Sequence, residues 1–506
     1  MATRRSTGLF PALIASFLGL GLSGLSGAGH AAEAGGAKRP NILFVIADDW
    51  SYGHAGAYGC SWIKTPAFDR IAKEGVLFTN CFTNNPKCSP CRASLLTGRN
   101  TWQLDEACNH NGIFPARWPV YPDLLEAAGY HVGFTGKGWG PGDFRSGGFR
   151  RNPAGPEYNR YKSRPPHRGI SGDDYARNFI AFLEDRQPGQ PFCFWFGGHE
   201  PHRAYEEGAG RRAGKNPKDV TLPAYYPDSD LIRDDLLDYA VEVEWFDTHL
   251  GRIIAHLEQI GELDDTFILV TSDHGMPFPR VKGQIYDHAF HIPLAIRWGT
   301  HIGSGRVVED FINVRDFAPT FLKLAGLEPP PSMTGRSFLD VLQSGKSGRV
   351  DPQRDRMLIG KERHDLGRPH DQGYPVRAIR TPEYLYVLNY EPDRWPVGNP
   401  ETGYPNCDNS PTKTLITSRF DEFYRLCFGK RPREELYRIT DDPDCIKNLA
   451  FDPKLRPIKQ KLREELEATL RQEGDPRALG RGEIFETYEY VGPRTHSYDA
   501  WLKYQR

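Results

Sequence analysis

Two closely spaced cysteines mark the most reactive run of side chains in the sequence. Residues 88–92 read Cys-Ser-Pro-Cys-Arg. Cysteines at this spacing are typical of a structural disulfide, a redox pair or half of a zinc site. A zinc site would require a second pair at comparable spacing, whereas the other seven of the nine cysteines are scattered along the chain. These interpretations leave the run poorly explained, so its surroundings have to be considered.

Polar side chains also follow three short apolar runs, at the point where each run ends. They are Asp48 with Asp49 after residues 41–46, His199 with His202 after residues 192–196, and Asp273 with His274 after residues 266–271. Short continuous apolar runs fit β-strands that are covered on both faces. In parallel sheets, ligands bind beyond the carboxyl ends of the strands. We therefore predict that the functional site lies at that edge.

The chemistry at Cys88 becomes specific when the run is extended to residue 99. Residues 88–99 read Cys-Ser-Pro-Cys-Arg-Ala-Ser-Leu-Leu-Thr-Gly-Arg, which resembles the signature of type I sulfatases, C-x-P-x-R followed by L-x-T-G-R. In that family the cysteine is oxidised after synthesis to formylglycine. The resemblance implies that Cys88 is the precursor of the catalytic nucleophile and that a formylglycine-generating maturation enzyme is a partner. Many relatives have serine in place of Cys91, so a Cys88–Cys91 disulfide is an alternative for the unmodified protein.

Two further motifs imply a metal site. The pair at residues 48–49 resembles the D-D of the family, and residues 271–275 resemble its S-D-[NH]-G. The resemblance implies one bound calcium ion, with the ligands Asp48, Asp49, Cys88, Asp273 and His274. A hard divalent cation prefers several carboxylate oxygens, which agrees with three of these residues. An imidazole is an unusual calcium ligand, so His274 leaves another divalent metal open.

Basic side chains in other motifs imply a site for the sulfate group. Arg92 belongs to the signature, Lys137 matches the G-K of the family, and Lys282 matches the K-G that follows the metal motif. The resemblance implies that the two lysines hold sulfate oxygens and that Arg92 fixes the nucleophile and the metal ligands. His202, in the H-x-P-H motif, is implied as the acid that protonates the leaving oxygen or nitrogen.

One position departs from the family pattern. Relatives commonly read G-K-x-H, and that histidine is thought to help expel sulfate, whereas Trp139 stands in its place here. Another group must then serve as the elimination base. We predict that His110, or a water held by Asp273, takes this role.

The segment after the metal motif points to a substrate class. Residues 272–279 read Ser-Asp-His-Gly-Met-Pro-Phe-Pro and resemble the S-D-N-G-[IM]-P-F-P of N-sulfoglucosamine sulfohydrolases, which implies a sulfated carbohydrate carrying N- or O-sulfate. Three later basic residues are predicted either to contact the sugar or to form an ordinary basic surface loop: Arg363, His364 and His370.

Two alternatives to a carbohydrate sulfatase stay open. Members of the same superfamily use the C-x-P-x-R nucleophile on phosphorus, which would make the chain a phosphodiesterase or phosphonate monoester hydrolase. The chain could also be a catalytically silent glycan-binding protein in which Cys88 is never converted.

The elements that must position these residues alternate between apolar runs and helical patterns. Apolar residues recur at helical spacing over residues 234–260, 123–128 and 174–184. This alternation predicts an α/β fold with a mostly parallel sheet flanked by helices, and the resemblance implies the alkaline-phosphatase-like version of it. We predict a catalytic domain at 38–352. Short β-like runs between turn residues predict a smaller C-terminal α+β subdomain with an antiparallel sheet at 353–506.

Charge and the composition of the first residues indicate compartment and partners. The 64 basic and 65 acidic residues leave a net charge of -1, so we expect no nucleic-acid partner. Residues 1–34 contain two adjacent arginines, an apolar glycine-rich stretch and then small residues, which predicts a signal peptide and a secreted or periplasmic protein. No later segment is apolar enough to span a bilayer, so stable membrane insertion is not expected.

Overall fold

An eight-stranded sheet forms the centre of residues 39–505, the part of the chain that the computed structural model describes. Its order is β3-β4-β1-β5-β6-β2-β7, with β8 paired to β2. The strands are β1 (Asn41–Ala47), β2 (Val76–Phe82), β3 (His131–Gly136), β4 (Phe192–Gly197), β5 (Thr266–Ser272), β6 (His291–Arg297), β7 (Arg306–Val308) and β8 (Ile312–Asn313). β6 runs antiparallel to β5 and β2, and the other pairs are parallel. The predicted α/β fold with a mostly parallel sheet is confirmed.

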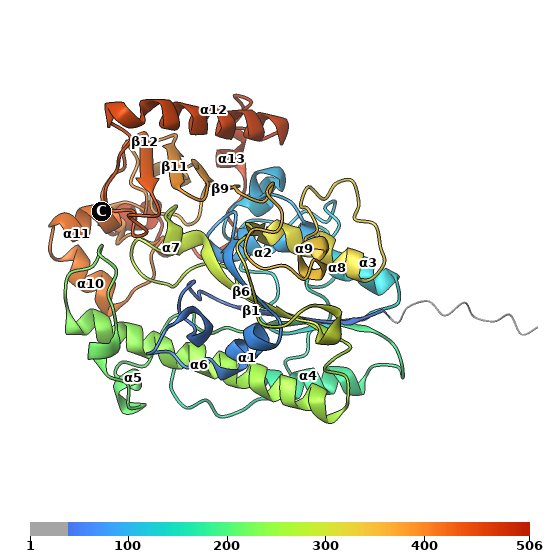
Figure 1. Ribbon diagram of the computed structural model, residues 1–506. Helices are drawn as coiled ribbons and strands as arrows, with labels where there is room; N and C mark the ends of the chain where they lie inside the picture. Colours follow the sequence, from blue (N-terminus) through green and yellow to red (C-terminus); the bar gives the residue numbers. More distant parts are fainter. Residues whose placement is uncertain (1–38, 506) are drawn as a thin grey trace, which may run out of the picture. The chain divides into compact units, whose positions relative to one another are not determined.

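Helices cover both faces of this sheet (Figure 1). One face packs against α1 (Pro66–Glu74), α4 (Tyr175–Glu184) and α6 (Asp230–Gln259), and the other against α2 (Cys88–Thr97), α3 (Tyr121–Ala127), α8 (Phe317–Leu324) and α9 (Leu339–Gln343). In β1, Leu43 and Val45 join the first core, whereas Ile42 and Phe44 join the second. Burial on both faces explains why β1 reads as a continuous apolar run without alternation.

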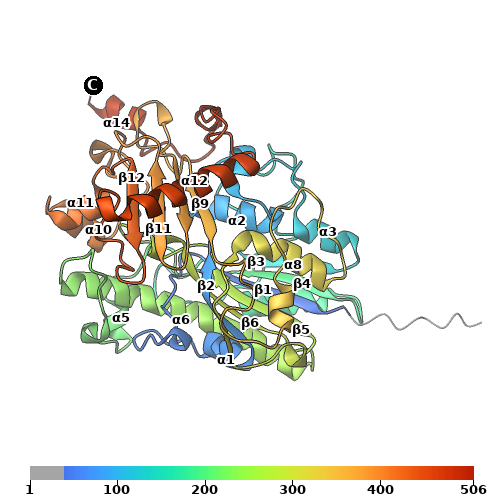
Figure 2. The ribbon, with the colours of Figure 1, turned by 45° about the horizontal axis from the view of Figure 1, so that its top comes forward.

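A separate antiparallel sheet lies in the last third of the chain (Figure 2). Its order is β12-β11-β10-β9, formed by β9 (Met357–Lys361), β10 (Val376–Arg380), β11 (Tyr384–Asn389) and β12 (Glu434–Arg438). The amphipathic helix α12 (Arg456–Gln472) packs on it through Leu462, Leu466 and Leu470. This is the antiparallel α+β arrangement predicted for the C-terminal region. The boundary after residue 352 stays a prediction, because the described residues pack as one compact unit.

The remaining helices are short and lie in connecting segments. They are α5 (Ala209–Arg212), α7 (Asp287–Phe290), α10 (Pro411–Thr417), α11 (Glu422–Phe428), α13 (Ile484–Thr487) and α14 (Tyr498–Tyr504). Within the described residues no helix combines the length and apolar character needed to cross a membrane. The predicted signal peptide at residues 1–34 lies outside the described part of the chain.

Candidate active site

Neighbouring strands deliver the predicted site residues to one edge of the large sheet. β1 lies between β4 and β5 and pairs in parallel with both. The residues that follow β1 and β5 therefore emerge side by side, which brings the Asp48-Asp49 pair next to the Asp273-His274 pair. β3, beyond β4, ends at the same edge and is followed directly by Lys137. The edge predicted from the apolar runs is where these side chains meet.

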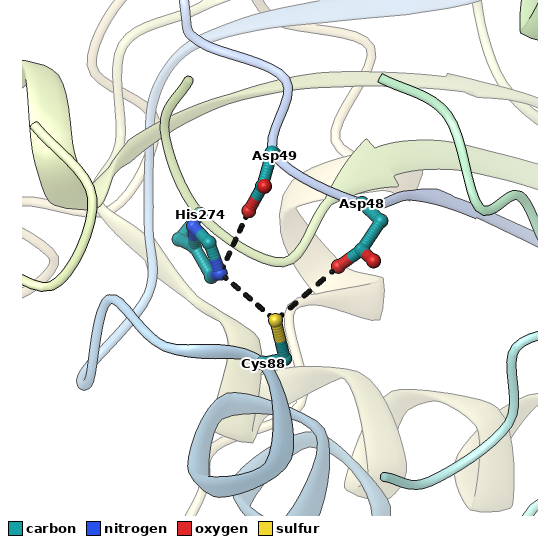
Figure 3. A group of neighbouring side chains, drawn as sticks. All are labelled: Asp48, Asp49, Cys88 and His274. Carbon is teal, nitrogen blue, oxygen red and sulfur yellow. Dashed lines mark hydrogen bonds and ion pairs between the residues drawn. The ribbon is translucent and has the colours of Figure 1, made fainter. Parts of the chain in front are cut away.

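Cys88 is the first residue of α2 and is only 1% exposed. Its thiol donates a hydrogen bond to Oδ1 of Asp48, with an Sγ–O distance of 3.4 Å, and its Sγ lies 3.4 Å from Nε2 of His274. The same imidazole nitrogen lies 3.1 Å from Oδ1 of Asp49. Figure 3 shows the four side chains converging from the segment after β1, the start of α2 and the loop after β5. The structure thus places the predicted nucleophile precursor among three of the predicted metal ligands.

The geometry of this cluster fits a divalent cation. One ligand atom from each of Asp48, Asp49, Cys88 and His274 lies within 4.8 Å of the others. Oδ1 of Asp49 is buried and accepts no hydrogen bond in the described part of the chain; its polar neighbour at 3.1 Å is Nε2 of His274, another candidate ligand, so a cation between them would satisfy this oxygen. Asp273, in contrast, accepts hydrogen bonds from Arg92 at 3.0 Å and from the backbone amide of Asp49 at 3.1 Å. The donor set suits a divalent metal without singling out calcium.

Three predicted cations surround the same cluster. The guanidinium of Arg92 is fully buried and lies 3.5 Å from Oδ1 of Asp48. Nζ of Lys137 lies 2.6 Å from the other oxygen of Asp48, and Nζ of Lys282 lies 2.7 Å from Oδ2 of Asp49. Each lysine therefore balances one of two adjacent carboxylates, and both ammonium groups stand beside the Cys88 cluster.

His202 is accompanied by an aspartate that no motif predicted. Ligand atoms of Asp49, His202 and Asp408 lie within 4.8 Å of one another, and Asp408 also lies 2.9 Å from Nζ of Lys282. Nδ1 of His202 donates to the carbonyl of Arg203 at 2.6 Å, which leaves Nε2 available to a substrate. Asp408 comes from a loop far along the chain, so sequence spacing gave no signal for it.

His110 belongs to a polar cluster that reaches the residue before the nucleophile. Its Nδ1 lies 2.8 Å from Oδ1 of Asp365, and Oδ2 of Asp365 lies 3.0 Å from Nζ of Lys87. Lys87 directly precedes Cys88 and caps α2. Lys87 was not predicted as a site residue, although its position beside the signature was a usable signal.

The three residues predicted to contact a sugar lie in different surroundings. His364 is fully buried, and its Nε2 donates to the side-chain oxygen of Asn85 at 2.9 Å. Arg363 is 3% exposed and donates to the backbone carbonyl of Tyr488 at 2.5 Å. His370 is exposed. The three side chains therefore differ in burial and in their contacts, and their role in binding a sugar stays a prediction.

Trp139 occupies a structural position next to the nucleophile. Its indole Nε1 donates to the carbonyl of Ser89 at 3.0 Å, and its ring packs 5.0 Å from that of Phe114. It thus supports the first turn of α2, on which Cys88 stands. Cys88 and Cys91 are both unpaired, as are the other cysteines of the described residues. The alternative Cys88–Cys91 disulfide is not formed in this structure.

Comparison with known proteins decides the family. A family model described as Sulfatase matches residues 40–327, more than half of the chain. The chain belongs to the sulfatase family. A second model, described as N-sulphoglucosamine sulphohydrolase, C-terminal, matches residues 278–395 of this sulfatase.

The sulfatase is similar to its relatives over most of its length. It is 28% identical over 451 residues to an ulvan-active sulfatase of Formosa agariphila, covering 87% of this chain and 81% of the relative. It is also 28% identical over 473 residues to the N-sulphoglucosamine sulphohydrolase of Homo sapiens, covering 85% and 89%. The lengths covered leave little of either chain unmatched.

Solved structures show the same fold. A structure determined in complex with its substrate D-glucosamine-2-N,6-O-disulfate matches with a TM-score of 0.61 at 23% identity, covering 87% of this chain and 99% of that chain. A phosphonate monoester hydrolase of Agrobacterium radiobacter matches with a TM-score of 0.65 at 20% identity, covering 86% and 96%. The predicted alkaline-phosphatase-like architecture is confirmed. At these identities the likeness concerns the fold alone.

The packed charges of the sulfatase site shift the pKa values of its side chains. Burial raises the pKa of Asp273 to about 7. Burial acts the other way on His274, but the Asp273 and Asp49 carboxylates raise its pKa to about 9. Burial also opposes ionisation of Asp48, yet Lys137 and then Arg92 hold the pKa of that carboxyl well below its usual range. Asp48 therefore stays ionised, which metal ligation requires.

Proposed function

We propose that this sulfatase removes the sulfate group from a sulfated amino sugar, with N-sulfated glucosamine as the preferred substrate class. The observation that carries the proposal is the placement of Lys137 and Lys282 on either side of the Cys88 cluster. A sulfate group is a tetrahedral, weakly basic anion, so its binding depends on charged donors at several of its oxygens. Two ammonium groups beside a buried nucleophile position supply these donors.

The residues present are suited to hold a metal ion and a modified side chain. Asp48, Asp49, Asp273 and His274 would hold one divalent ion, and we propose calcium, which would make a bound hydroxyl more acidic and neutralise charge on the sulfuryl group. Formylglycine formed from Cys88 would supply, as its hydrate, a nucleophile that can later release sulfate. Removing metal with a chelator and restoring Ca²⁺ or Mg²⁺ separately would test the identity of the ion.

Each remaining side chain has a role that follows from its contacts. Arg92 holds Asp48 and Asp273 in place, and Lys137 and Lys282 bind sulfate oxygens. His202 protonates the leaving nitrogen or oxygen from Nε2, because its Nδ1 proton is held by a backbone carbonyl.

Sulfate expulsion needs a base in place of the histidine that Trp139 replaces. We propose His110, whose Nδ1 is oriented by Asp365 so that Nε2 can take up a proton. His110→Ala should lower turnover, and unchanged turnover in this variant would exclude the role.

The substrate class is supported by two comparisons. The model that matches residues 278–395 is described by N-sulphoglucosamine sulphohydrolase, and the human relative carries the same name. O-sulfate is the second candidate, because another relative, 28% identical over 402 residues, is an N-acetylglucosamine-6-O-sulfatase of Bacteroides thetaiotaomicron. We further propose that a formylglycine-generating enzyme matures the chain, that the protein is exported, and that the exposed His370 contacts the carbohydrate.

The test is a side-by-side assay on protein whose formylglycine content at residue 88 is known from peptide mass. Sulfate or phosphate release would be measured from N-sulfoglucosamine, glucosamine 6-O-sulfate, an aryl sulfate and a phosphonate monoester. We expect N-sulfoglucosamine to give the highest kcat/KM. Faster turnover of the phosphonate ester would favour the phosphorus alternative. Native protein with an unmodified Cys88 thiol would favour the silent glycan-binding protein.

A further inference from the structure

A small polar cavity lies between the second sheet and the loop that carries Lys282. Its volume is about 10 Å³, room for one water-sized occupant. Strands β9, β10, β11 and β12 all contribute to its wall, together with the loop at residues 284–286. The polar residues that line it are Gln284, Tyr286, Lys361, Tyr374, Asn389, Arg431 and Glu435.

Several hydrogen-bond donors in this wall are buried without a partner. They are the hydroxyl of Tyr374, the side-chain amide nitrogen of Gln284 and Nε of Arg431. Tyr374 is 2% exposed and Gln284 is 3% exposed, so bulk water does not satisfy them. Each unmatched buried donor costs free energy, and three around one cavity indicate an occupant that accepts hydrogen bonds.

The charge around the cavity is positive. Lys361 is 2% exposed, and its Nζ donates to the carbonyls of Gly283 at 2.7 Å and Pro396 at 3.5 Å. Arg368 and Arg431 likewise donate to backbone carbonyls. In the described part of the chain no carboxylate forms an ion pair with any of these three cations. Burial, and then the two guanidinium groups, hold the pKa of Lys361 well below its usual range, so an anion beside its Nζ would favour the charged form of this lysine.

The one acid in the wall already accepts three hydrogen bonds. Glu435 accepts from the amide of Asn389 at 2.8 Å and from the hydroxyls of Tyr286 at 3.1 Å and Tyr437 at 2.6 Å. A water molecule in the cavity would need acceptors for its own protons as well as donors, and the donors without partners outnumber the position that this carboxylate still offers. A monatomic anion needs donors only.

We propose that this cavity binds a halide-sized anion, with chloride as the physiological ligand. Lys361, Arg431, Tyr374 and Gln284 hold it, and its charge compensates the buried cations that lack carboxylates. Lys361 also binds the carbonyl of the residue after Lys282, so the anion stabilises the loop on which that lysine stands. The site is separate from the Cys88 cluster, and its occupancy does not depend on turnover.

The first test locates the ion. Crystals grown with bromide in place of chloride should give an anomalous scattering peak in the cavity beside Lys361, and Lys361→Met should abolish it. The proposal would be overturned if the bromide-grown crystals showed electron density for a water molecule in the cavity and no anomalous signal.

The second test uses thermal unfolding of the full chain in chloride and in gluconate at equal ionic strength. Chloride should raise Tm by about 1–2 °C. Tyr374→Phe should lose this increment and leave Tm in gluconate unchanged, because it removes a donor that lacks a protein partner. Tyr130→Phe is the matched control: its hydroxyl donates to the carbonyl of Pro40, so Tm should fall equally in both salts. The proposal would be overturned if chloride raised Tm equally in Tyr374→Phe and in the wild-type protein. It would also be overturned if chloride raised Tm in neither.

Discussion

The two lysines that flank Cys88 are held in different ways. Lys137 directly follows β3, contacts Asp48 and keeps 16% of its side chain exposed. Lys282 lies in a loop, contacts both Asp49 and Asp408, and is 2% exposed. One cation is therefore placed by two strands of a single sheet, β3 and β1 with β4 between them, whereas the other needs a loop from the last quarter of the chain. This difference indicates that the second sheet and its loops complete the active site as well as bordering it.

The largest effect is expected at the position that both lysines serve. Cys88→Ala removes the precursor of the nucleophile and should lower kcat/KM by about 10⁴-fold or more. Binding of inorganic sulfate by calorimetry should persist, because Lys137 and Lys282 remain. Residual turnover close to that of the wild-type protein would mean that the lysines serve another nucleophile.

Replacing each lysine in turn separates the contribution of Lys137 from that of Lys282. Lys137→Met and Lys282→Met should each lower kcat/KM by about 10²-fold, the size expected for one donor to a developing charge. Unfolding in urea should distinguish them. Lys282→Met leaves the buried Asp49 and the partly exposed Asp408 without the lysine they share and should cost about 3 kcal/mol, whereas Asp48 keeps Arg92 in Lys137→Met. Equal losses of stability would contradict the comparison.

Asp408 tests whether the distant loop contributes to catalysis. Asp408→Asn keeps the shape of the side chain but removes the charge next to Lys282, so kcat/KM should fall by about 10-fold. Asp441→Asn is the matched control, since Asp441 is 67% exposed and its ion pair with Arg438 is long, at 3.5 Å. A loss in the control of the same size would show that the effect is not specific to the Lys282 side.

A buried acid in a helix that packs on the large sheet should contribute to the pH dependence of stability. Burial, and then the Glu200 carboxylate, raise the pKa of Glu242 in α6 to about 9. The protonated form is the stable one, so its contribution is complete below the ordinary carboxyl pKa and is lost as pH rises towards 9. Urea unfolding from pH 5 to 9 should show a decline in the free energy of unfolding, and Glu242→Gln should make that decline smaller by about 1–3 kcal/mol. The decline should persist unchanged in Lys282→Met.

The sequence predicts the part of the site that one sheet builds. Asp48 and Asp273 follow apolar runs, and the parallel pairing of those two strands leaves one edge where they can meet. Lys137 was implied only by the resemblance of its G-K motif. Asp408 could not be predicted in this way, because its contact with Lys282 depends on how a loop without regular structure packs. The contact of the Arg363 side chain could not be predicted for the same reason, because its guanidinium binds a carbonyl from the C-terminal segment.

Burial of Cys88 has a consequence for biosynthesis. The thiol lies at the start of α2, beneath side chains that come from β1 and from the loop after β5. The maturation enzyme that we propose could not reach this thiol in the folded chain, so conversion would have to precede folding. More than 400 residues follow Cys88 in the sequence of 506, and Asp273 and His274 are among them. Asp273 and His274 complete the cluster around Cys88, so on this proposal a chain that folds before conversion keeps its thiol.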